Sequence, residues 1–298
     1  MLRKALLGGH RKPFGFRLKL LLPPTTMHLK TIAAFVAATA GVQAQVQINE
    51  IFINPPSTDN GMEFIEFKGA ANQSLTGLHL LMIVGDGTSA GLIDVALDLG
   101  SLSLGSNGLL LWRDNSTVLN PAPASGTAVH VADFTPDIEN GSNTYVIVSG
   151  FSGTAGVTDL DTNNDGVLDS TPWTSVVNAI GLVENDGASN VGYAVALGGI
   201  SYGPNAGFNA DALVRLANDA NILFGGDVTG TTPGSFPFTE ATTAYSSGTY
   251  TFGDIVGTAQ LTPGSENFSA VPEPQEYAAI AGVLALGAAV WRRRANRA

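Results

Sequence analysis

Between residues 46 and 268 the chain alternates short apolar runs with segments rich in Gly, Asn, Asp and Pro. Branched aliphatic and aromatic residues are frequent in eight of these runs, at 46–53, 64–67, 78–84, 92–99, 109–112, 145–148, 175–182 and 191–196. Runs of this length between turn-forming residues are typical of the strands of a β-sandwich. Within the body, a short helix is predicted only for residues 210–220. We therefore expect an all-β fold for residues 45–268.

A further apolar run, residues 31–40, lies near the N-terminus. It follows a basic segment and is followed by small residues up to Ala44. This order is the anatomy of a secretory signal peptide, and the run is too short to span a membrane. We expect cleavage after Ala44 and translation from Met27. The alternative is a long basic extension, residues 1–26, that still permits export.

The last apolar run, residues 278–291, precedes a cluster of arginines. Its 14 residues make a helix of about 21 Å, which is short against a hydrocarbon core of roughly 30 Å. We expect a single C-terminal transmembrane helix with its basic end in the cytoplasm. The prolines before it keep that segment extended and accessible to a protease. The sorting candidates are Pro272, Glu273 and Pro274 before the helix, and Arg292, Arg293 and Arg294 after it.

Residues 271–298 resemble the PEP-CTERM sorting signal, because a Pro-Glu-Pro motif, a short apolar helix and an arginine cluster occur in that order. The resemblance implies processing near the motif by an exosortase-type membrane protease, in bacteria that make extracellular polysaccharide. Before processing, the chain would be held at the inner membrane. The alternative is an ordinary single-helix tail anchor.

Composition restricts the partners of the body. Only 13% of all residues are charged and 36 are glycine, which suits turn-rich β-structure. From residue 45 to 270, three basic residues stand against 23 carboxylates, so we expect no binding to nucleic acid. There is no cysteine, which excludes disulfides, thiolate metal sites and thiol nucleophiles. Divalent cations or basic partners fit such a body better.

Several segments of the body resemble a lamin-tail domain, which is an immunoglobulin-like sandwich. They are QINEI at 47–51, NP at 54–55, EFIEF at 63–67, LTGL at 75–78 and a closing LTPGSEN at 261–267. Residues 45–268 are longer than a simple domain of that family, so we expect an insertion near 120–210. The resemblance implies interaction rather than catalysis.

One loop has the spacing of an oxygen-ligand cation site. Oxygen donors alternate along it, and Gly166 at the sixth position allows a sharp turn, as in loops that wrap Ca²⁺. Pro172 stands where an EF-hand has its bidentate Glu, so a true EF-hand is excluded. We expect a structural Ca²⁺ loop; the alternative is an Asx-rich turn held by its own hydrogen bonds. The candidate ligands are Asp161, Asn163, Asp165, the carbonyl of Val167, and Asp169.

No coherent catalytic set is present. Ser89 lies in a G-x-S-x-G match, but a strand-like segment follows it where a nucleophile elbow needs a helix. The body offers only His79 and His130 as catalytic bases. Glu63 and Glu66 are three residues apart, so on one strand they would point to opposite faces and not converge on a substrate.

The sequence therefore predicts an exported, non-catalytic surface or extracellular-matrix protein with a structural or interaction body. One alternative is a polysaccharide-binding module that uses Trp112 or Trp173 to stack on sugars. A secreted hydrolase that uses Ser89 is the other alternative.

Overall fold

The structure is a computed structural model that is mostly β-sheet. It describes residues 45–56, 61–115, 122–184, 190–204, 210–230, 236–239, 244–246, 255–256, 258–270 and 274–295. The predicted signal peptide with Ala44, and Pro272 and Glu273 of the sorting motif, lie outside these ranges.

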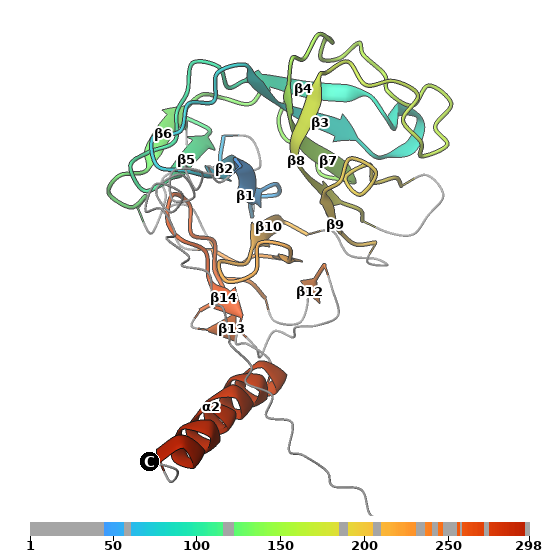
Figure 1. The fold of residues 1–298 in the computed structure, drawn as a ribbon. Coiled ribbons are helices and arrows are strands. Elements are labelled where there is room, and N and C mark those ends of the chain that lie inside the picture. The colour runs from blue at the N-terminus through green and yellow to red at the C-terminus, as the bar shows by residue number, and fades with distance from the viewer. Residues whose placement is uncertain are drawn as a thin grey trace, which may run out of the picture. The chain divides into compact units, whose positions relative to one another are not determined.

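The first sheet has seven strands in the order β12-β11-β10-β1-β2-β5-β6 (Figure 1). Its pairings are antiparallel apart from β5 with β6, which are parallel. The strands are β1 (Gln47–Phe52), β2 (Phe64–Lys68), β5 (Leu109–Arg113), β6 (Ala128–Val131), β10 (Ala212–Arg215), β11 (Leu223–Gly226) and β12 (Ala244–Tyr245).

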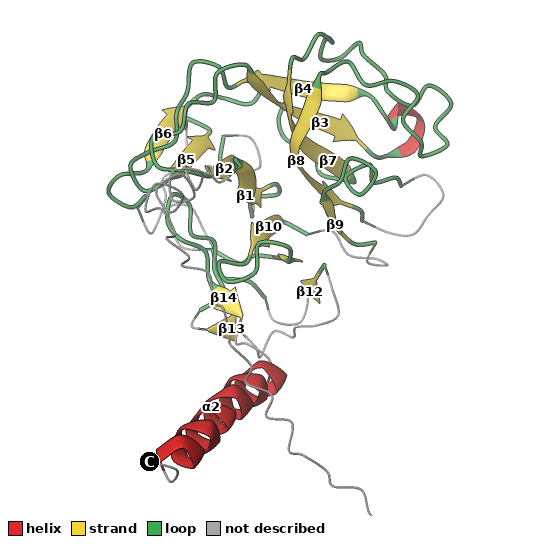
Figure 2. Cartoon of the chain, viewed as in Figure 1, coloured by secondary structure: helices red, strands yellow, loops and turns green. Residues whose placement is uncertain are grey.

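The second sheet has five strands in the order β4-β3-β7-β8-β9, and loops connect most of its elements (Figure 2). Among its described pairings, β8 and β9 are parallel and the others are antiparallel. The strands are β3 (Leu78–Val84), β4 (Ile93–Asp98), β7 (Asn143–Ser149), β8 (Ser175–Leu182) and β9 (Ile200–Tyr202). The remaining elements are a two-stranded sheet of β13 (Ile255–Val256) and β14 (Ser269–Ala270), a 3-10 turn η1 (Gly87–Ser89) and a helix α2 (Pro274–Ala295).

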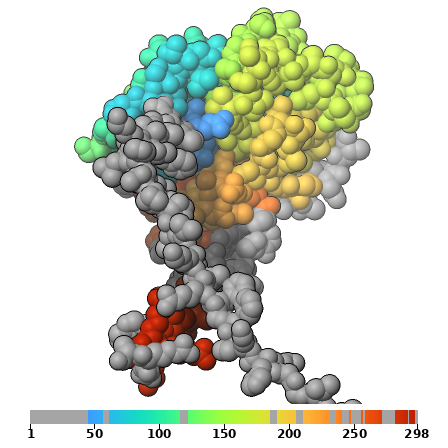
Figure 3. Space-filling model, in the orientation of Figure 1, coloured from blue at the N-terminus to red at the C-terminus, as the bar shows by residue number. Residues whose placement is uncertain are grey.

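The two large sheets share one apolar core, which makes the body a β-sandwich. Ile48 and Ile65 of the first sheet are buried with Leu80, Tyr145 and Ile180 of the second. Side chains alternate between the two faces of a strand, so these residues mark the inner face of each sheet. On the face shown in the space-filling view, the yellow-green part of the chain near residue 150 lies beside the cyan part (Figure 3).

Each sheet is also covered on its outer face. Phe52, Phe64 and Val214 on the outer face of the first sheet pack against Leu261 and Phe268. A third cluster covers the outer face of the second sheet and contains Leu81, Val146, Leu160 and Tyr193. Strands buried on both faces read as continuous apolar runs, and this accounts for LLMIV in β3 and YVIV in β7.

Seven of the eight predicted strand segments contain observed strands, and two predictions are wrong. Residues 210–220 contain β10 instead of a helix, because Leu213 faces the inner core while Ala212 and Val214 face the outer one. Residues 191–196 are no strand. The chain turns at Tyr193 and Ala194, where the amide of Leu197 donates to the Tyr193 carbonyl oxygen at 3.1 Å.

The region between residues 120 and 210 is integral to the sandwich. It supplies β6 at one edge of the first sheet and β7, β8 and β9 of the second. Strand β7 pairs with β3 over seven registered positions, from Leu78 opposite Ser149 to Val84 opposite Asn143.

The C-terminal helix α2 contains the whole predicted apolar run 278–291. Among the described residues, no helix is both long enough and apolar enough to cross a membrane. The reason lies in the sequence: only 15 residues separate Glu276 from Arg292, so any 18-residue window of α2 includes at least one charge. The three arginines do lie in the last turn of α2, as expected.

Candidate functional site

Two glutamates lie side by side on the outer face of the first sheet. Glu50 of β1 stands directly opposite Glu66 of β2, and both are fully buried. Their neighbours across the sheet are apolar: Val214 of β10 beside Glu50, and Leu111 of β5 beside Glu66. Burying a carboxylate costs free energy unless it is hydrogen-bonded, so this pair requires specific partners.

Strand alternation explains why both carboxylates reach the same face. Glu50 is two residues from Phe52, and Glu66 is two residues from Phe64. Since side chains two apart share a face, the glutamates join the phenylalanines of the outer cluster. Residues 261–268, called the closing segment from here on, lie over this face, with Leu261 and Phe268 buried in the same cluster.

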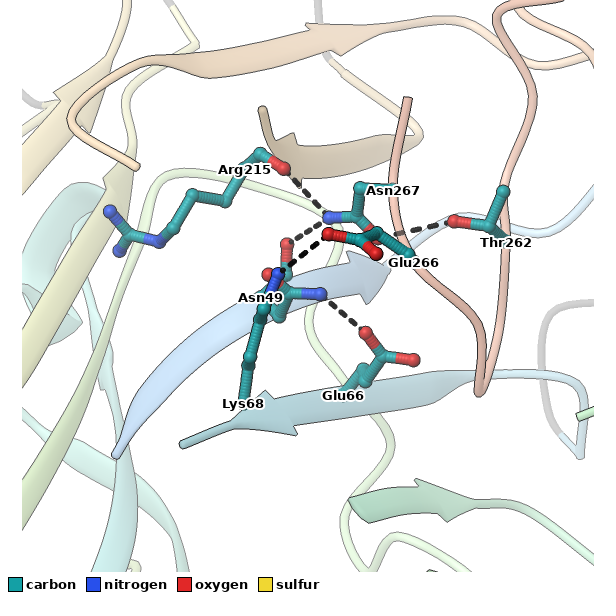
Figure 4. Close-up of polar contacts among 7 residues, drawn as sticks. All are labelled: Asn49, Glu66, Lys68, Arg215, Thr262, Glu266 and Asn267. Carbon is teal, nitrogen blue, oxygen red and sulfur yellow. Dashed lines mark hydrogen bonds and ion pairs between the residues drawn. The ribbon is translucent and has the colours of Figure 1, made fainter. Parts of the chain in front are cut away.

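The closing segment is hydrogen-bonded directly to both carboxylates; Figure 4 shows Glu66 with Asn49, and Thr262 with Asn267. Oε1 of Glu50 accepts from the amide of Thr262 at 2.9 Å, and Oε2 lies 3.0 Å from the Thr262 hydroxyl. Oε2 of Glu66 accepts from the amide of Gly264 at 2.6 Å, while its Oε1 accepts from Nδ2 of Asn49. Two segments about 200 residues apart along the chain are thereby joined.

A tight turn shapes the closing segment for these contacts. The amide of Ser265 donates to the carbonyl of Thr262 at 2.8 Å, and Gly264 has φ +74°. Pro263 followed by glycine with positive φ is the pattern of a type II turn. A Cβ on Gly264 would also lie 2.5 Å from Cβ of Pro123, so both conformation and space require glycine here.

Asn267 fixes the far end of the closing segment. Its Nδ2 donates to the carbonyl oxygens of Asn49 and Arg215, at 3.0 and 2.7 Å, and Figure 4 shows this amide between the two strands. Asn267 is 5% exposed. The segment is thus attached to β1, β2 and β10 at once.

Burial controls the electrostatics of the pair. It raises the pKa of Glu50 to about 8. The pKa of Glu66 is raised well above its usual value, first by burial and then by the neighbouring Glu50, and nearby Lys68 opposes this. The Lys68 ammonium itself lies 3.5 Å from the carboxylate of Glu266. Two adjacent carboxylates that are buried from solvent do not readily both ionise, because their charges repel each other. The pair therefore holds a proton near neutral pH.

Arg215 lies behind the pair and binds neutral oxygens. Its Nε donates to the carbonyl of Ile48 at 2.9 Å, one NH group donates to the Ala220 carbonyl, and the other lies 3.4 Å from Oδ1 of Asn178. Desolvation lowers its pKa to about 10. Because Asn178 belongs to β8, Arg215 links the first sheet to the second.

The arrangement can hold chain segments together, but it is closed to solvent. A nearby surface cavity exposes the Lys68–Glu266 pair without reaching the two buried carboxylates among its lining residues. That cavity is lined by Lys68, Asn107, Leu109, Ala124, Ser125 and Glu266.

The candidate calcium loop is ordered by its own hydrogen bonds. Asp161 is fully buried, and its Oδ1 and Oδ2 accept from the amides of Asp165 and Gly166 at 3.1 and 2.8 Å. Asn163 and Asp165 each accept from an amide two residues ahead. These are the contacts of the Asx-rich turn that was the alternative to a cation site.

The remaining candidate ligand, Asp169, is bonded within the same loop. Its Oδ2 accepts from the amide and hydroxyl of Thr162, and these bonds lower the pKa of Asp169. The exposed Val167 donates its amide to Asp165 at 2.9 Å. In the described part of the chain, no three acidic or histidine side chains are grouped as a metal site, so Ca²⁺ binding stays a prediction.

The structure does not assemble the hydrolase candidates. Ser89 ends η1, His79 lies in β3 beside the ring of Phe151, and His130 lies in β6 beside Trp112. No hydrogen bond joins Ser89 to either histidine in the described ranges. Neither imidazole is therefore placed as a base for the serine.

Glu63 and Trp112 are less accessible than the sequence indicated. Glu63 is fully buried, and its Oε2 accepts from the amide of Ile138 at 3.0 Å, whereas Glu66 binds the closing segment. The two glutamates do not converge. Trp112 is 7% exposed and donates from Nε1 to the Ala132 carbonyl, so it cannot stack on a sugar; Trp173 is half-buried.

Sequence reasoning missed the pairing of Glu50 with Glu66. A signal for it exists, since Phe52 and Phe64 stand on the face that would otherwise be read as polar. Two aromatic residues on that face indicate that another segment covers it.

No family model, curated protein or solved structure matches this chain.

Proposed function

We propose that the protein is an exported, non-catalytic surface or extracellular-matrix protein whose body is a structural or interaction domain. The burial of Glu50 and Glu66 carries this proposal. Both carboxylates are used to hold the closing segment and are sealed from water, so neither meets a substrate. Among the described residues no hydrogen bond joins Ser89 to His79 or His130, which supports the same conclusion.

The body is proposed to be an immunoglobulin-like sandwich of lamin-tail type. Three of the segments that carry this resemblance, 47–51, 63–67 and 261–267, come together at the buried pair, where Thr262 is bonded to Glu50 and Gly264 to Glu66. These three segments lie far apart in the sequence but meet at Glu50 and Glu66. Their meeting supports a common structural role for them. In that role the closing LTPGSEN segment completes the sandwich.

The C-terminal tail is proposed to be a sorting signal that an exosortase-type membrane protease processes at the PEP motif. Helix α2 ends in three arginines, and Val283, Leu284 and Leu286 are each 68–70% exposed. An apolar surface of this kind requires a partner that removes it from water. A short helix of this kind suits a transient hold at the inner membrane before release.

Processing is tested with the full chain in an exosortase-containing bacterium that makes extracellular polysaccharide. One epitope tag follows Gln45 and a second follows Ala298. Wild type should yield an exported product without the C-terminal tag, and Glu273→Ala should keep both tags in the membrane fraction. Glu276→Ala, just past the motif, is the matched control and should be processed. Equal processing of wild type and Glu273→Ala would refute the sorting proposal.

The absence of catalysis is tested separately on the exported product. Assays with polysaccharide, ester and nucleic-acid substrates should give no turnover, and a serine-directed covalent probe should not label Ser89. Reproducible turnover that disappears in Ser89→Ala would establish the hydrolase instead.

A polysaccharide-binding body is the second candidate, and it now depends on Trp173. This side chain packs against the outer cluster of the second sheet and is half-buried, so part of it stays accessible for stacking on a sugar. Glycan-array binding that Trp173→Ala abolishes without unfolding the protein would support this function. Trp112→Phe is the control, since the buried ring cannot contact a glycan.

A further inference from the structure

Three oxygen atoms form a chain that begins at Glu50. Its Oε2 lies 3.0 Å from Oγ1 of Thr262, which lies 3.1 Å from Oδ1 of Asn267. The orientation of the Asn267 amide is defined, because Nδ2 donates to two carbonyl oxygens, those of Asn49 and Arg215. Oδ1 of Asn267 therefore faces Thr262 and acts as an acceptor.

The Thr262 hydroxyl has one proton, so it donates to only one of its two neighbours. With an ionised Glu50, both neighbours would be acceptors, and one of the two contacts would lack a proton. With a proton on Oε2, Glu50 donates to Thr262, and Thr262 donates to Asn267. Glu50 and Asn267 are buried, where an unsatisfied acceptor is costly. The geometry thus favours a neutral Glu50.

Glu66 fits the opposite state. Its two oxygens face the amide of Gly264 and Nδ2 of Asn49, and both of these groups are donors. A proton on Glu66 would find no acceptor in either of these groups. The two donors suit an ionised carboxylate. Although burial and Glu50 raise the pKa of Glu66 as well, the hydrogen-bond geometry favours Glu50 as the residue that carries the proton of the pair.

Few charges surround the pair in the described part of the chain. Lys68 follows Glu66 on β2, and Glu266 on the closing segment pairs with that lysine at 3.5 Å. Arg215 of β10 directs its guanidinium to the carbonyls of Ile48 and Ala220, away from Glu66 in Figure 4. Among the described residues no cation bonds to Glu50, so a charge there would face Glu66 without compensation.

We propose that the proton on Glu50 is a latch: through Thr262 and Asn267 it holds the closing segment on the sheet, and its loss in alkaline solution releases the segment. The latch lies immediately before the tail. The protonation of Glu50 therefore determines how firmly the closing segment, which directly precedes the tail, is held on the sheet. This inference rests on the hydrogen-bond geometry and is independent of the proposed function.

Amide hydrogen exchange of the full chain tests the latch. The measured quantity is the protection factor of a peptide covering residues 261–268, at pH 6 and pH 9, with a peptide covering β7 as the internal reference. In the wild type, protection of the closing segment should fall from pH 6 to pH 9 at least tenfold more than protection of β7 does, because β7 reports global unfolding.

Two matched variants distinguish the site of the proton. Glu50→Gln replaces the O–H donor by an N–H donor, so the closing segment should stay protected at both pH values. Glu66→Gln places an NH2 group against one of the two donors, the amide of Gly264 or Nδ2 of Asn49, so protection should fall at least tenfold already at pH 6. Three results would each overturn the proposal. They are wild-type protection of residues 261–268 that is the same at pH 9 as at pH 6, a loss of this protection in E50Q, and equal protection in E66Q and E50Q.

If E66Q also lowers the protection of β7, that variant has destabilised the whole body. A third variant then decides the test. Thr262→Val removes the hydroxyl between Glu50 and Asn267 while keeping the size of the side chain and the backbone amide. Its closing segment should lose protection at pH 6 to the level of wild type at pH 9. Wild-type protection in T262V would overturn the latch.

Discussion

The hydroxyl of Tyr193 donates to Oδ2 of Asp161 across 2.8 Å, although 32 residues separate the two in the chain. Both side chains are fully buried. Burial, followed by the Asp161 carboxylate, raises the pKa of Tyr193, so the phenol stays protonated and can donate. This bond ties the loop that begins at Asp161 to the turn at Tyr193, above the outer face of the second sheet.

Removing this hydroxyl should destabilise the body. We expect Tyr193→Phe to lower the free energy of unfolding by about 1.5–3 kcal/mol, the range for a hydrogen bond to a charged group. Tyr202→Phe is the control, because that hydroxyl donates to a neutral carbonyl, of Gly225, at 3.0 Å. Urea denaturation of both variants measures the difference. A cost in Y193F no greater than that in Y202F would contradict the charge-assisted bond.

Stability should depend on pH through the buried pair. The pKa of Glu50 is raised from 4.5 to about 8, so the folded state keeps a proton that the unfolded chain releases. Stability is then greatest below about pH 4.5 for this group and declines as the pH rises to about 8. We expect a loss on the order of 3 kcal/mol between pH 5 and pH 8.5.

Chemical denaturation at a series of pH values measures this slope. Glu50→Gln should remove most of it, because the amide does not titrate. Asp169, whose pKa is lowered by its bonds to Thr162, titrates below the window and does not contribute. An equal slope in wild type and E50Q would assign the pH dependence to other groups.

The turn in the closing segment should tolerate no side chain at Gly264. We expect Gly264→Ala to cost about 2–4 kcal/mol, because positive φ strain adds to a clash with Pro123. Gly77→Ala is the matched control: Gly77 has φ +78°, and a Cβ there meets nothing within 4 Å. Thermal denaturation should show a clearly larger loss for G264A. Equal losses would mean that backbone strain alone is responsible.

Calcium binding by the loop that contains Asp161 and Asp165 is tested by melting. With a dissociation constant near 1 mM, as in extracellular modules, 10 mM Ca²⁺ would stabilise the protein by about 1.4 kcal/mol relative to chelator. Asp165→Asn is the control, since it removes a charge but keeps an oxygen acceptor for the amide of Val167. If Ca²⁺ does not change the melting temperature of the wild type, the loop is an Asx-rich turn held by its own hydrogen bonds.

Much of the fold follows from local patterns. The apolar runs located seven strands because a strand buried on both faces needs apolar side chains at successive positions. The predicted helix at 210–220 failed because burial on both faces of β10 overrides the modest helix propensity of Ala and Leu. The tail helix was located by its apolar residues, and among the described residues no helix is long and apolar enough to cross a membrane.

The sequence by itself determined the all-β class, the positions of most strands and the spacing of the loop at Asp161. Only the tertiary structure decided the fate of Glu50 and Glu66. Each lies at a position that alternation alone assigns to a solvent face. Whether water reaches that face depends on Thr262 and its neighbours, 212 residues further along the chain. Burial of a carboxylate, and hence its protonation, is set by such distant contacts and not by its own strand.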